Sequence, residues 1–183
     1  MTADARLGAL KAIVEAKALK RDGSFKLASG ATSTFYLDMR LVSMDPAGAT
    51  LIGELMLDAL AGGTADAVGG LETGAIPVVA AIVQASHRRG RPVSGFYVRK
   101  KAKEHGTGSR IEGNLPRGGT VVVVEDVTTS GESAVQAVEA VRAAGCRVDR
   151  VLTVVDREAG AAAGLARHDL TLTALLTRAD FGV

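Results

Sequence analysis

Two adjacent carboxylates and a run of hydroxyl residues stand together near the middle of the chain. Residues 121–134 read VVVVEDVTTSGESA, so Glu125 and Asp126 follow four valines and precede a hydroxyl-rich turn that ends in glycine. Carboxylates only accept hydrogen bonds, which suits sugar hydroxyls or a metal ion. Backbone amides and hydroxyls in front of a helix attract a phosphate, because the positive end of the helix dipole lies behind them. A ribose 5-phosphate would satisfy both ends of the segment, whereas the plainer alternative is a strand-end turn with Thr and Ser as helix caps.

A basic segment is the second candidate for chemistry. Four cations stand within residues 99–103, and His105 and several glycines follow them. Such clusters are usually solvated charge runs. Here, however, the cations follow an apolar strand, and a departing diphosphate needs cations to neutralise it. Residues 99–119 show no helical or strand period, so we expect a long functional loop.

The elements that must position these groups follow a regular rhythm. Apolar strands alternate with helices along most of the chain, which predicts an α/β fold with a mostly parallel central sheet flanked by helices. In such sheets, ligands bind beyond the carboxyl ends of the strands. A hairpin or two short strands are expected in residues 24–42. The predicted helices cover residues 5–20, 46–60, 75–90, 130–145 and 158–169, and the predicted strands cover residues 66–70, 92–98, 120–126, 146–156 and 170–177.

Composition narrows the classes of protein. The 183 residues are 47% hydrophobic and 23% charged, which indicates one globular domain. Aromatic residues make up 3% and the net charge is +2, so neither a stacking platform for nucleic acid nor a basic membrane surface is expected. Cys146 is the single cysteine, which fits a reducing compartment and a small packed residue. The charged N-terminal segment and the absence of a long apolar run predict a cytoplasmic protein without a membrane span.

Residues 121–134 resemble the phosphoribosyl-diphosphate signature of the type I phosphoribosyltransferases, in which two acids and a hydroxyl-rich turn follow an apolar strand. The resemblance implies the type I phosphoribosyltransferase fold with a small N-terminal hood, in a single domain over residues 1–183. The hood would comprise about residues 1–45 with the C-terminal segment. The resemblance places the ribose hydroxyls on Glu125 and the catalytic Asp126. It places the 5-phosphate on the turn formed by Val127, Thr128, Thr129, Ser130, Gly131, Glu132 and Ser133.

The basic segment RKKAKEHGTG is similar to the catalytic loop of the orotate phosphoribosyltransferase family. By that resemblance Arg99, Lys100, Lys103 and His105 contact the diphosphate, and Lys103 and His105 take part in catalysis. The family also implies Mg²⁺ as cofactor, held mainly through diphosphate and water without a protein ligand. It further implies a homodimer in which the loop reaches the active site of the partner subunit.

Three other stretches agree with the resemblance. GGLETGAIP, residues 69–77, resembles the short pyrophosphate loop, and its glycines permit an anion to approach the backbone. Arg157 in VVDREAG stands where the family pairs an arginine with the orotate carboxylate, and Thr129 is expected beside it. Residues 35–38 match the hood that covers the pyrimidine. Two family lysines are missing, since Ala28 and the pair Glu72-Thr73 occupy their positions.

These features predict transfer of ribose 5-phosphate from 5-phosphoribosyl 1-diphosphate to orotate in pyrimidine synthesis. One alternative is a purine or uracil phosphoribosyltransferase, although a base without a carboxylate has no need of Arg157. The other alternative is a phosphoribosyltransferase-like regulator that binds nucleic acid. No nucleic-acid or membrane partner is expected, because the chain shows neither a strongly basic stripe nor an added domain.

Overall fold

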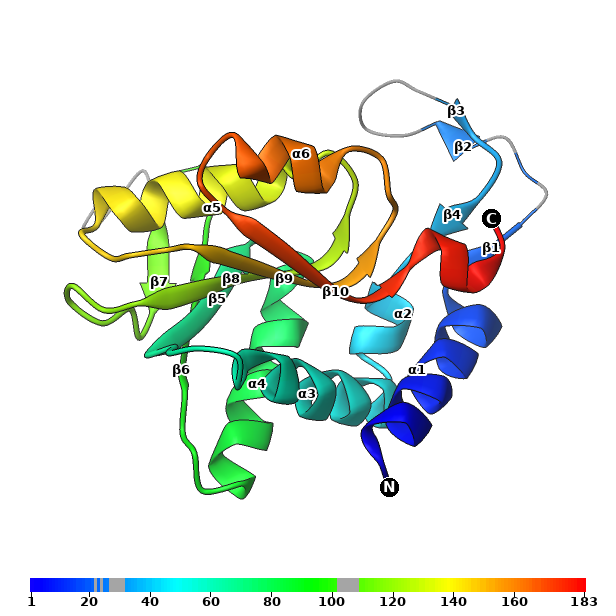
Figure 1. The fold of residues 1–183 in the computed structure, drawn as a ribbon, viewed down its shortest axis with the longest axis horizontal. Coiled ribbons are helices and arrows are strands. Elements are labelled where there is room, and N and C mark those ends of the chain that lie inside the picture. The colour runs from blue at the N-terminus through cyan, green and yellow to red at the C-terminus, as the bar shows by residue number, and fades with distance from the viewer. Residues whose placement is uncertain (22, 24, 27–31, 102–108) are drawn as a thin grey trace.

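A six-stranded sheet forms the centre of the molecule in the computed structural model, which describes residues 1–183 except 22, 24, 27–31 and 102–108 (Figure 1). Along the sheet the strands are β10 (Thr171–Thr177), β9 (Arg150–Asp156), β8 (Val121–Thr128), β5 (Ala67–Leu71), β6 (Ser94–Val98) and β7 (Ile111–Gly113). The first five are parallel and β7 is antiparallel to β6. The mostly parallel sheet predicted from the sequence is therefore confirmed.

β7 corrects the expectation that residues 99–119 contain no strand. Val98 pairs with Ile111, and Phe96 pairs with Gly113, which has a φ of +100°. A three-residue antiparallel edge strand is too short to show a period of two, so the sequence pattern carried no signal of it. The hairpin geometry holds the two described ends of this loop side by side at the edge of the sheet.

Helices cover both faces of the sheet (Figure 1). Because side chains alternate along a strand, Val122 and Val124 of β8 pack into one core cluster, and Val121 and Val123 pack into the other. One face carries α5 (Glu132–Ala143) and α6 (Ala161–Ala166), and the other carries α3 (Pro46–Leu60) and α4 (Ala75–Arg88), with α1 (Ala3–Lys17) against α3. The α6 helix is shorter than predicted because it begins after Gly160, whose φ is +96°.

The start of α3 follows the sequence prediction. The Asp45 carboxylate accepts hydrogen bonds from the amides of Ala47 and Gly48 at 3.1 and 2.9 Å, and Pro46 occupies the first turn. Further along, a Cβ atom on Gly53 would lie 2.5 Å from the carbonyl oxygen of Ala81. This glycine therefore lets α3 and α4 approach closely, which fixes α4 against the sheet.

The N-terminal residues form a small layer at one end of the sheet. Two antiparallel pairs are present, β1 (Leu19–Lys20) with β4 (Tyr36–Leu37) and β2 (Phe25–Lys26) with β3 (Thr32–Ser33), which confirms the predicted hairpin. The short helix α2 (Arg40–Ser43) and the C-terminal turn η1 (Arg178–Phe181) were not predicted. Arg21 donates to the carbonyl oxygen of Phe181 at 2.8 Å, which joins the C-terminal segment to this layer.

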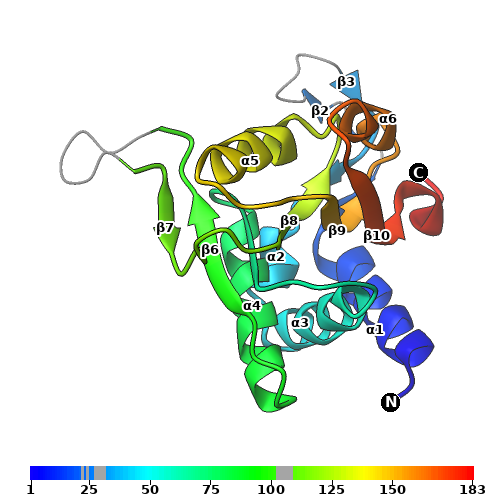
Figure 2. The same ribbon diagram turned by 60° about the vertical axis from the view of Figure 1, so that its left-hand side comes forward.

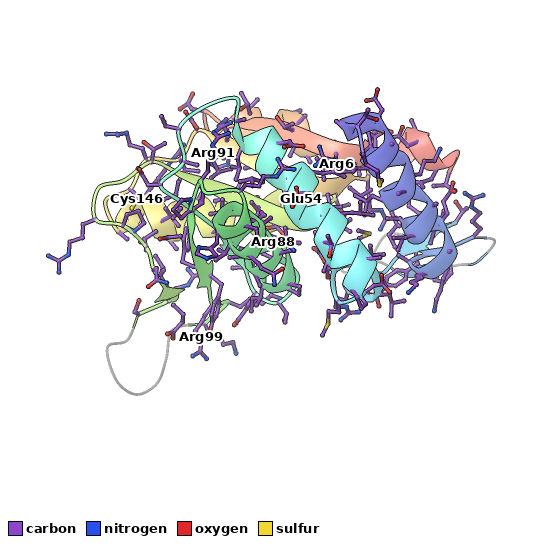
Figure 3. All side chains as sticks on the ribbon, turned by 90° about the horizontal axis from the view of Figure 1, so that it is seen from below. Arg6, Glu54, Arg88, Arg91, Arg99 and Cys146 are labelled. Atoms are coloured by element: carbon purple, nitrogen blue, oxygen red, sulfur yellow. The ribbon has the colours of Figure 1, made fainter. Side chains whose placement is uncertain are left out.

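Ion pairs hold α1 on the helices below the sheet. Arg6 of α1 lies 2.6 Å from Asp58 and 3.4 Å from Glu54, both on α3. Arg88 of α4 lies 3.6 Å from Glu54, and Arg89 pairs with both acids. Figure 3 shows Arg6, Glu54 and Arg88 on these three helices, with α3 lying between α1 and α4. No helix in the described part of the chain is long and apolar enough to cross a bilayer.

Candidate active site

The carboxyl ends of the parallel strands β5, β6, β8 and β9 lie at the same end of the sheet, which is called the site edge below. The hood strands lie at that end as well (Figure 2). Four segments leave the strands there: the loop before α4, the segment after β6, the turn before α5 and the residue after β9. The parallel arrangement therefore brings together groups that are separated by up to about half of the chain.

Asp126 stands at the centre of this edge. Its Oδ1 accepts a hydrogen bond from the Val127 amide at 2.8 Å. A Cβ atom on Gly74 would lie 2.5 Å from the same oxygen, so the carboxylate lies against the start of α4. Burial raises the pKa of Asp126, while the Val127 amide and the positive charge of Arg40 act in the opposite direction. The carboxylate is half-buried and its remaining lone pairs can accept hydrogen bonds from a ligand.

Glu125 occupies a different environment from its neighbour. Its side chain is 5% exposed, and its buried Oε1 has no hydrogen-bond partner within the described residues. Burial raises the pKa of Glu125 well above its ordinary value, the Asp126 carboxylate adds to the rise, and Lys100 opposes it. Because neighbouring strand residues point to opposite faces, Glu125 lies toward the α5 side and Asp126 toward the α4 side. The two carboxylates therefore lie on opposite faces of β8, and their shared role at the ribose stays a prediction.

The turn between β8 and α5 has hydrogen-bond donors that could bind an anion. Thr128 is 3% exposed, and its buried Oγ1 has no partner within the described residues. Gly131 precedes α5 with a φ of +87° and brings no side chain to cap the helix. The first amides of α5 therefore face the turn without a side-chain acceptor. Thr129, Ser130, Glu132 and Ser133 are half-buried or exposed around it, and the Val127 side chain packs against the α3 and α4 core, which leaves its backbone for the ligand.

The loop between β5 and α4 forms a second glycine-lined segment. A Cβ atom on Gly70 would lie 2.1 Å from the Val124 carbonyl oxygen, so only glycine fits there. Glu72 donates its amide to the Val98 carbonyl and accepts the Lys100 amide on Oε1, both at 2.8 Å. The peptide bond between Glu72 and Thr73 is cis. These bonds hold the start of the basic segment beside this loop.

The predicted basic residues fall into two groups. Arg99 is half-buried and lies 3.8 Å from Glu112 of β7, and Lys100 is exposed at the strand end (Figure 3 labels Arg99). Lys103 and His105 lie outside the described residues, as does Ala28 in the hood. The structure therefore places Arg99 and Lys100 at the site edge, while the two loop residues remain a prediction.

Arg157 joins the site to the hood. Its amide donates to the Thr128 carbonyl at 2.9 Å, because β8 and β9 pair in register up to their ends. Its side chain is 8% exposed, and its guanidinium carbon lies 4.4 Å from the centroid of the Phe35 ring. Burial and the nearby Arg178 lower the pKa of Arg157, yet an arginine stays charged in proteins. A buried, charged fork at this position suits a planar carboxylate.

The sequence missed the pair formed by Asp38 and Arg40. Arg40 donates from Nε and Nη2 to the two carboxylate oxygens of Asp38 at 2.8 and 2.9 Å. Burial raises the pKa of Asp126, and the positive charge of Arg40 acts in the opposite direction. The spacing Asp-Met-Arg directly after a strand was the available signal, but it has meaning only once α2 is known to lie beside the site.

Comparisons with known proteins agree with this geometry. Residues 44–167 match the family described as "Phosphoribosyl transferase domain". An orotate phosphoribosyltransferase from Bradyrhizobium sp. (strain ORS 278) is 49% identical over 164 residues, which cover 87% of this chain and 88% of that protein. The crystal structure of Mycobacterium tuberculosis H37Rv orotate phosphoribosyltransferase in complex with Fe(III) dicitrate superposes with a TM-score of 0.86 at 39% identity, over 97% of this chain and 99% of that one. A structure of the M. tuberculosis enzyme in complex with 5-phospho-alpha-D-ribosyl 1-diphosphate gives a TM-score of 0.81 at 36% identity over 97% and 99% of the two chains.

Proposed function

The chain belongs to the phosphoribosyl transferase family, and within it to the orotate phosphoribosyltransferases, and we propose the role of each site residue in that reaction. The enzyme transfers ribose 5-phosphate from 5-phosphoribosyl 1-diphosphate to orotate, and orotidine 5-phosphate and diphosphate are formed, as a step of pyrimidine biosynthesis. The observation that carries the choice of acceptor is Arg157. It presents a buried guanidinium over the Phe35 ring, where the hood meets the end of β9.

The sugar donor binds along the strand edge. Its 5-phosphate is received by the turn from Val127 to Ser133, which is supported by the uncapped start of α5 and the unpartnered Thr128 hydroxyl within the described residues. Asp126 accepts hydrogen bonds from the ribose hydroxyls and fixes the ring. The buried Oε1 of Glu125, which has no partner among the described residues, accepts a further hydrogen bond from the same ribose. It approaches the sugar from the other side of β8 than Asp126 does.

The diphosphate lies over the loop between β5 and α4. Gly74 at the start of α4 has no side chain, so the first amides of that 14-residue helix are open to an anion. Lys100 and Arg99 stand beside this loop, and Lys103 and His105 act from the segment between β6 and β7. As the bond between the anomeric carbon and diphosphate breaks, these cations stabilise the growing negative charge, and N1 of orotate forms the new bond to that carbon.

Magnesium fits as a counter-ion of the donor. Within the described residues, no group of three His, Cys, Asp or Glu side chains is close enough to hold a metal. Beside phosphates, Mg²⁺ is usually held by phosphate oxygens and water with one or two carboxylates, so the diphosphate would supply most of its ligands. When bound, the ion neutralises charge on the leaving group.

The acceptor binds between the hood and β9. Arg157 forms two parallel hydrogen bonds with the orotate carboxylate, and Thr129 contacts the same base from the turn. The charge of orotate at neutral pH is on its carboxylate, so N1 must lose its proton as it bonds to the anomeric carbon. An oxygen of the departing diphosphate can accept that proton, and no separate strong general base is needed. Catalysis is therefore positional and electrostatic, with the hood excluding water from a cationic sugar.

A homodimer completes the site. It is supported by an apolar groove of about 220 Å³ on the outer side of α4 and β6, lined by Val79, Ala80, Val83 and Tyr97 among others. The groove lies beside β6, from which the catalytic segment leaves, so a second copy docked there would receive that segment. The cytoplasm is the proposed location, which is supported by the single cysteine, Cys146, buried as a free thiol.

An assay of base consumption tests the function. Orotate, hypoxanthine, adenine and uracil are each incubated with 5-phosphoribosyl 1-diphosphate, the chain and Mg²⁺. Consumption of orotate alone, with release of diphosphate, is expected. Consumption of a purine or uracil without orotate would replace the substrate assignment, and donor binding without turnover of any base would favour a regulator.

A further inference from the structure

The Asp38–Arg40 pair is held by three hydrogen bonds and keeps unused N–H donors on the guanidinium. Asp38 accepts hydrogen bonds from Nε and Nη2 of Arg40 at 2.8 and 2.9 Å, and its Oδ1 also accepts one from the Arg40 amide at 3.3 Å. The Asp38 amide itself donates to the Ala18 carbonyl at 3.1 Å, which anchors the pair to the hood. A guanidinium has five N–H groups, and Asp38 occupies two of them. The others have no partner within the described part of the chain, and the side chain is 59% exposed.

Packing fixes the segment that carries Arg40 beside α4. Met39 and Val42, on either side of the start of α2, are 1% and 0% exposed, so this segment is fixed in the core. The α2 helix packs against α4, whose N-terminal Gly74 lies against the Asp126 carboxylate. Arg40 and Asp126 influence each other electrostatically, which agrees with this placement.

The charges around Arg40 identify the group it would bind. The loop between β5 and α4 carries Glu72 and Thr73 and no basic residue, although it adjoins the proposed diphosphate position. The 5-phosphate lies at α5 on the other face of the sheet, and the ribose hydroxyls need acceptors such as Asp126. An exposed arginine on α2, which packs against α4 and whose charge acts on Asp126, therefore has the diphosphate as the most suitable anionic partner in the donor.

We propose that Arg40 is a substrate-contacting residue that binds the diphosphate of the sugar donor from the hood side, with Asp38 as its positioning residue. It supplies the cation that the loop between β5 and α4 lacks. The fork of Asp38 holds the guanidinium in place, so little side-chain entropy is lost when the donor binds. The hood thereby contacts both substrates, the base through its aromatic side chains and the donor through Arg40.

The test compares Arg40→Gln and Arg40→Lys with Arg117→Gln, which changes an exposed arginine remote from the site. This inference rests on the proposed function, so orotate turnover by the unmodified chain is measured first. In Arg40→Gln the KM for 5-phosphoribosyl 1-diphosphate should rise about 10- to 100-fold, while the KM for orotate changes less than about threefold. In Arg40→Lys the KM for 5-phosphoribosyl 1-diphosphate should lie between the values of the unmodified chain and Arg40→Gln, because lysine keeps the charge but cannot form two parallel hydrogen bonds. Arg117→Gln should match the unmodified chain.

Calorimetry shows which part of the sugar donor, the diphosphate or the ribose 5-phosphate, Arg40 binds. Binding of inorganic diphosphate should weaken in Arg40→Gln by the same factor as binding of the donor, and binding of ribose 5-phosphate should not change. Equal losses for ribose 5-phosphate, or an unchanged affinity for diphosphate, would overturn the proposal. The calorimetric result stands even if orotate is not the acceptor, so the two proposals fail separately. Should Arg40→Gln unfold at a lower temperature, Arg40→Lys and Asp38→Asn decide: a selective loss of diphosphate affinity in both supports the contact, and a loss in neither refutes it.

Discussion

The guanidinium carbon of Arg157 lies 4.4 Å from the centroid of the Phe35 ring, although the two residues are 122 positions apart in the chain. Both side chains are buried, at 8% and 5% exposure. An aromatic face attracts a cation most strongly when water is excluded. This contact therefore joins the hood to the strand that presents the proposed orotate arginine, and it makes the position of Arg157 depend on the hood.

Phe35→Leu should raise the KM for orotate about 10- to 30-fold, because it keeps an apolar side chain but removes the ring beneath the cation. The KM for the sugar donor should stay within about threefold. Steady-state kinetics with each substrate varied in turn measures both values. Phe181→Leu is the matched control, since Phe181 belongs to the same core cluster and lies in the C-terminal turn. Equal effects of the two substitutions would show that packing, and not the ring, matters.

Arg157→Lys should weaken the binding of orotate more than the binding of the sugar donor. A lysine keeps the charge but cannot form two parallel bonds to a carboxylate, so a rise in the orotate KM of about 10- to 100-fold is expected. Arg167→Lys, at an exposed site after α6, should behave like the unmodified chain. A selective rise in the donor KM would contradict the assignment of Arg157 to the base.

Gly74→Ala should lower kcat/KM about 10- to 100-fold, since a displacement of about 1 Å at a reacting group has effects of that size. The new Cβ would lie 2.5 Å from Oδ1 of Asp126, so the carboxylate must move. Gly8→Ala in α1 meets nothing within 4 Å and should instead stabilise the fold by about 0.5–1 kcal/mol. Kinetics and urea unfolding of both variants check this, and full activity of Gly74→Ala would remove Asp126 from the catalytic centre.

Glu125→Gln should make the fold more stable than the native chain at pH values above the unfolded pKa of Glu125. Burial raises the pKa of Glu125 in the folded chain, so between the unfolded and folded pKa the folded state holds a proton that the unfolded state has released. The native chain then has its full stability below the unfolded pKa and loses stability as pH rises toward the folded pKa, by about 1.4 kcal/mol per unit of difference. Glutamine cannot ionise. Urea unfolding from pH 4 to 8 should show a gap between variant and native chain that opens with rising pH, while the exposed Glu139→Gln should show none.

Ala80→Glu should weaken self-association. Ala80 is exposed and lines the apolar groove on α4, so a charge there would be buried without a partner in the proposed dimer. The dissociation constant should rise at least about 100-fold, since an unpaired buried charge costs about 3–5 kcal/mol. Sedimentation velocity measures the change. Ala163→Glu on α6, across the sheet, should leave association unchanged, and a dimer that tolerates Ala80→Glu would place its interface elsewhere.

The sequence by itself determined the five parallel strands, the helices between them and the capped start of α3, and it predicted a sugar-phosphate site at the end of β8. Four valines indicate a buried strand, Asp45-Pro46 marks a helix start, and carboxylates beside hydroxyls suit a sugar phosphate. Each of these signals is local, since it depends on backbone preference or on the type of a neighbouring side chain. The short strand β7 was not predicted, because a pattern with a period of two cannot be recognised in three residues.

The tertiary structure alone decided which of these residues act together. Alternation along β8 sends Glu125 to the α5 side and Asp126 to the α4 side, although they are adjacent in the chain. Parallel pairing of β8 with β9 places Arg157 beside Thr128, and the hood brings Phe35 onto it. The Asp38–Arg40 pair gains its proposed role from the packing of α2 on α4. Contacts between distant segments depend on how the sheet, the helices and the hood pack together, and local sequence patterns do not determine that packing.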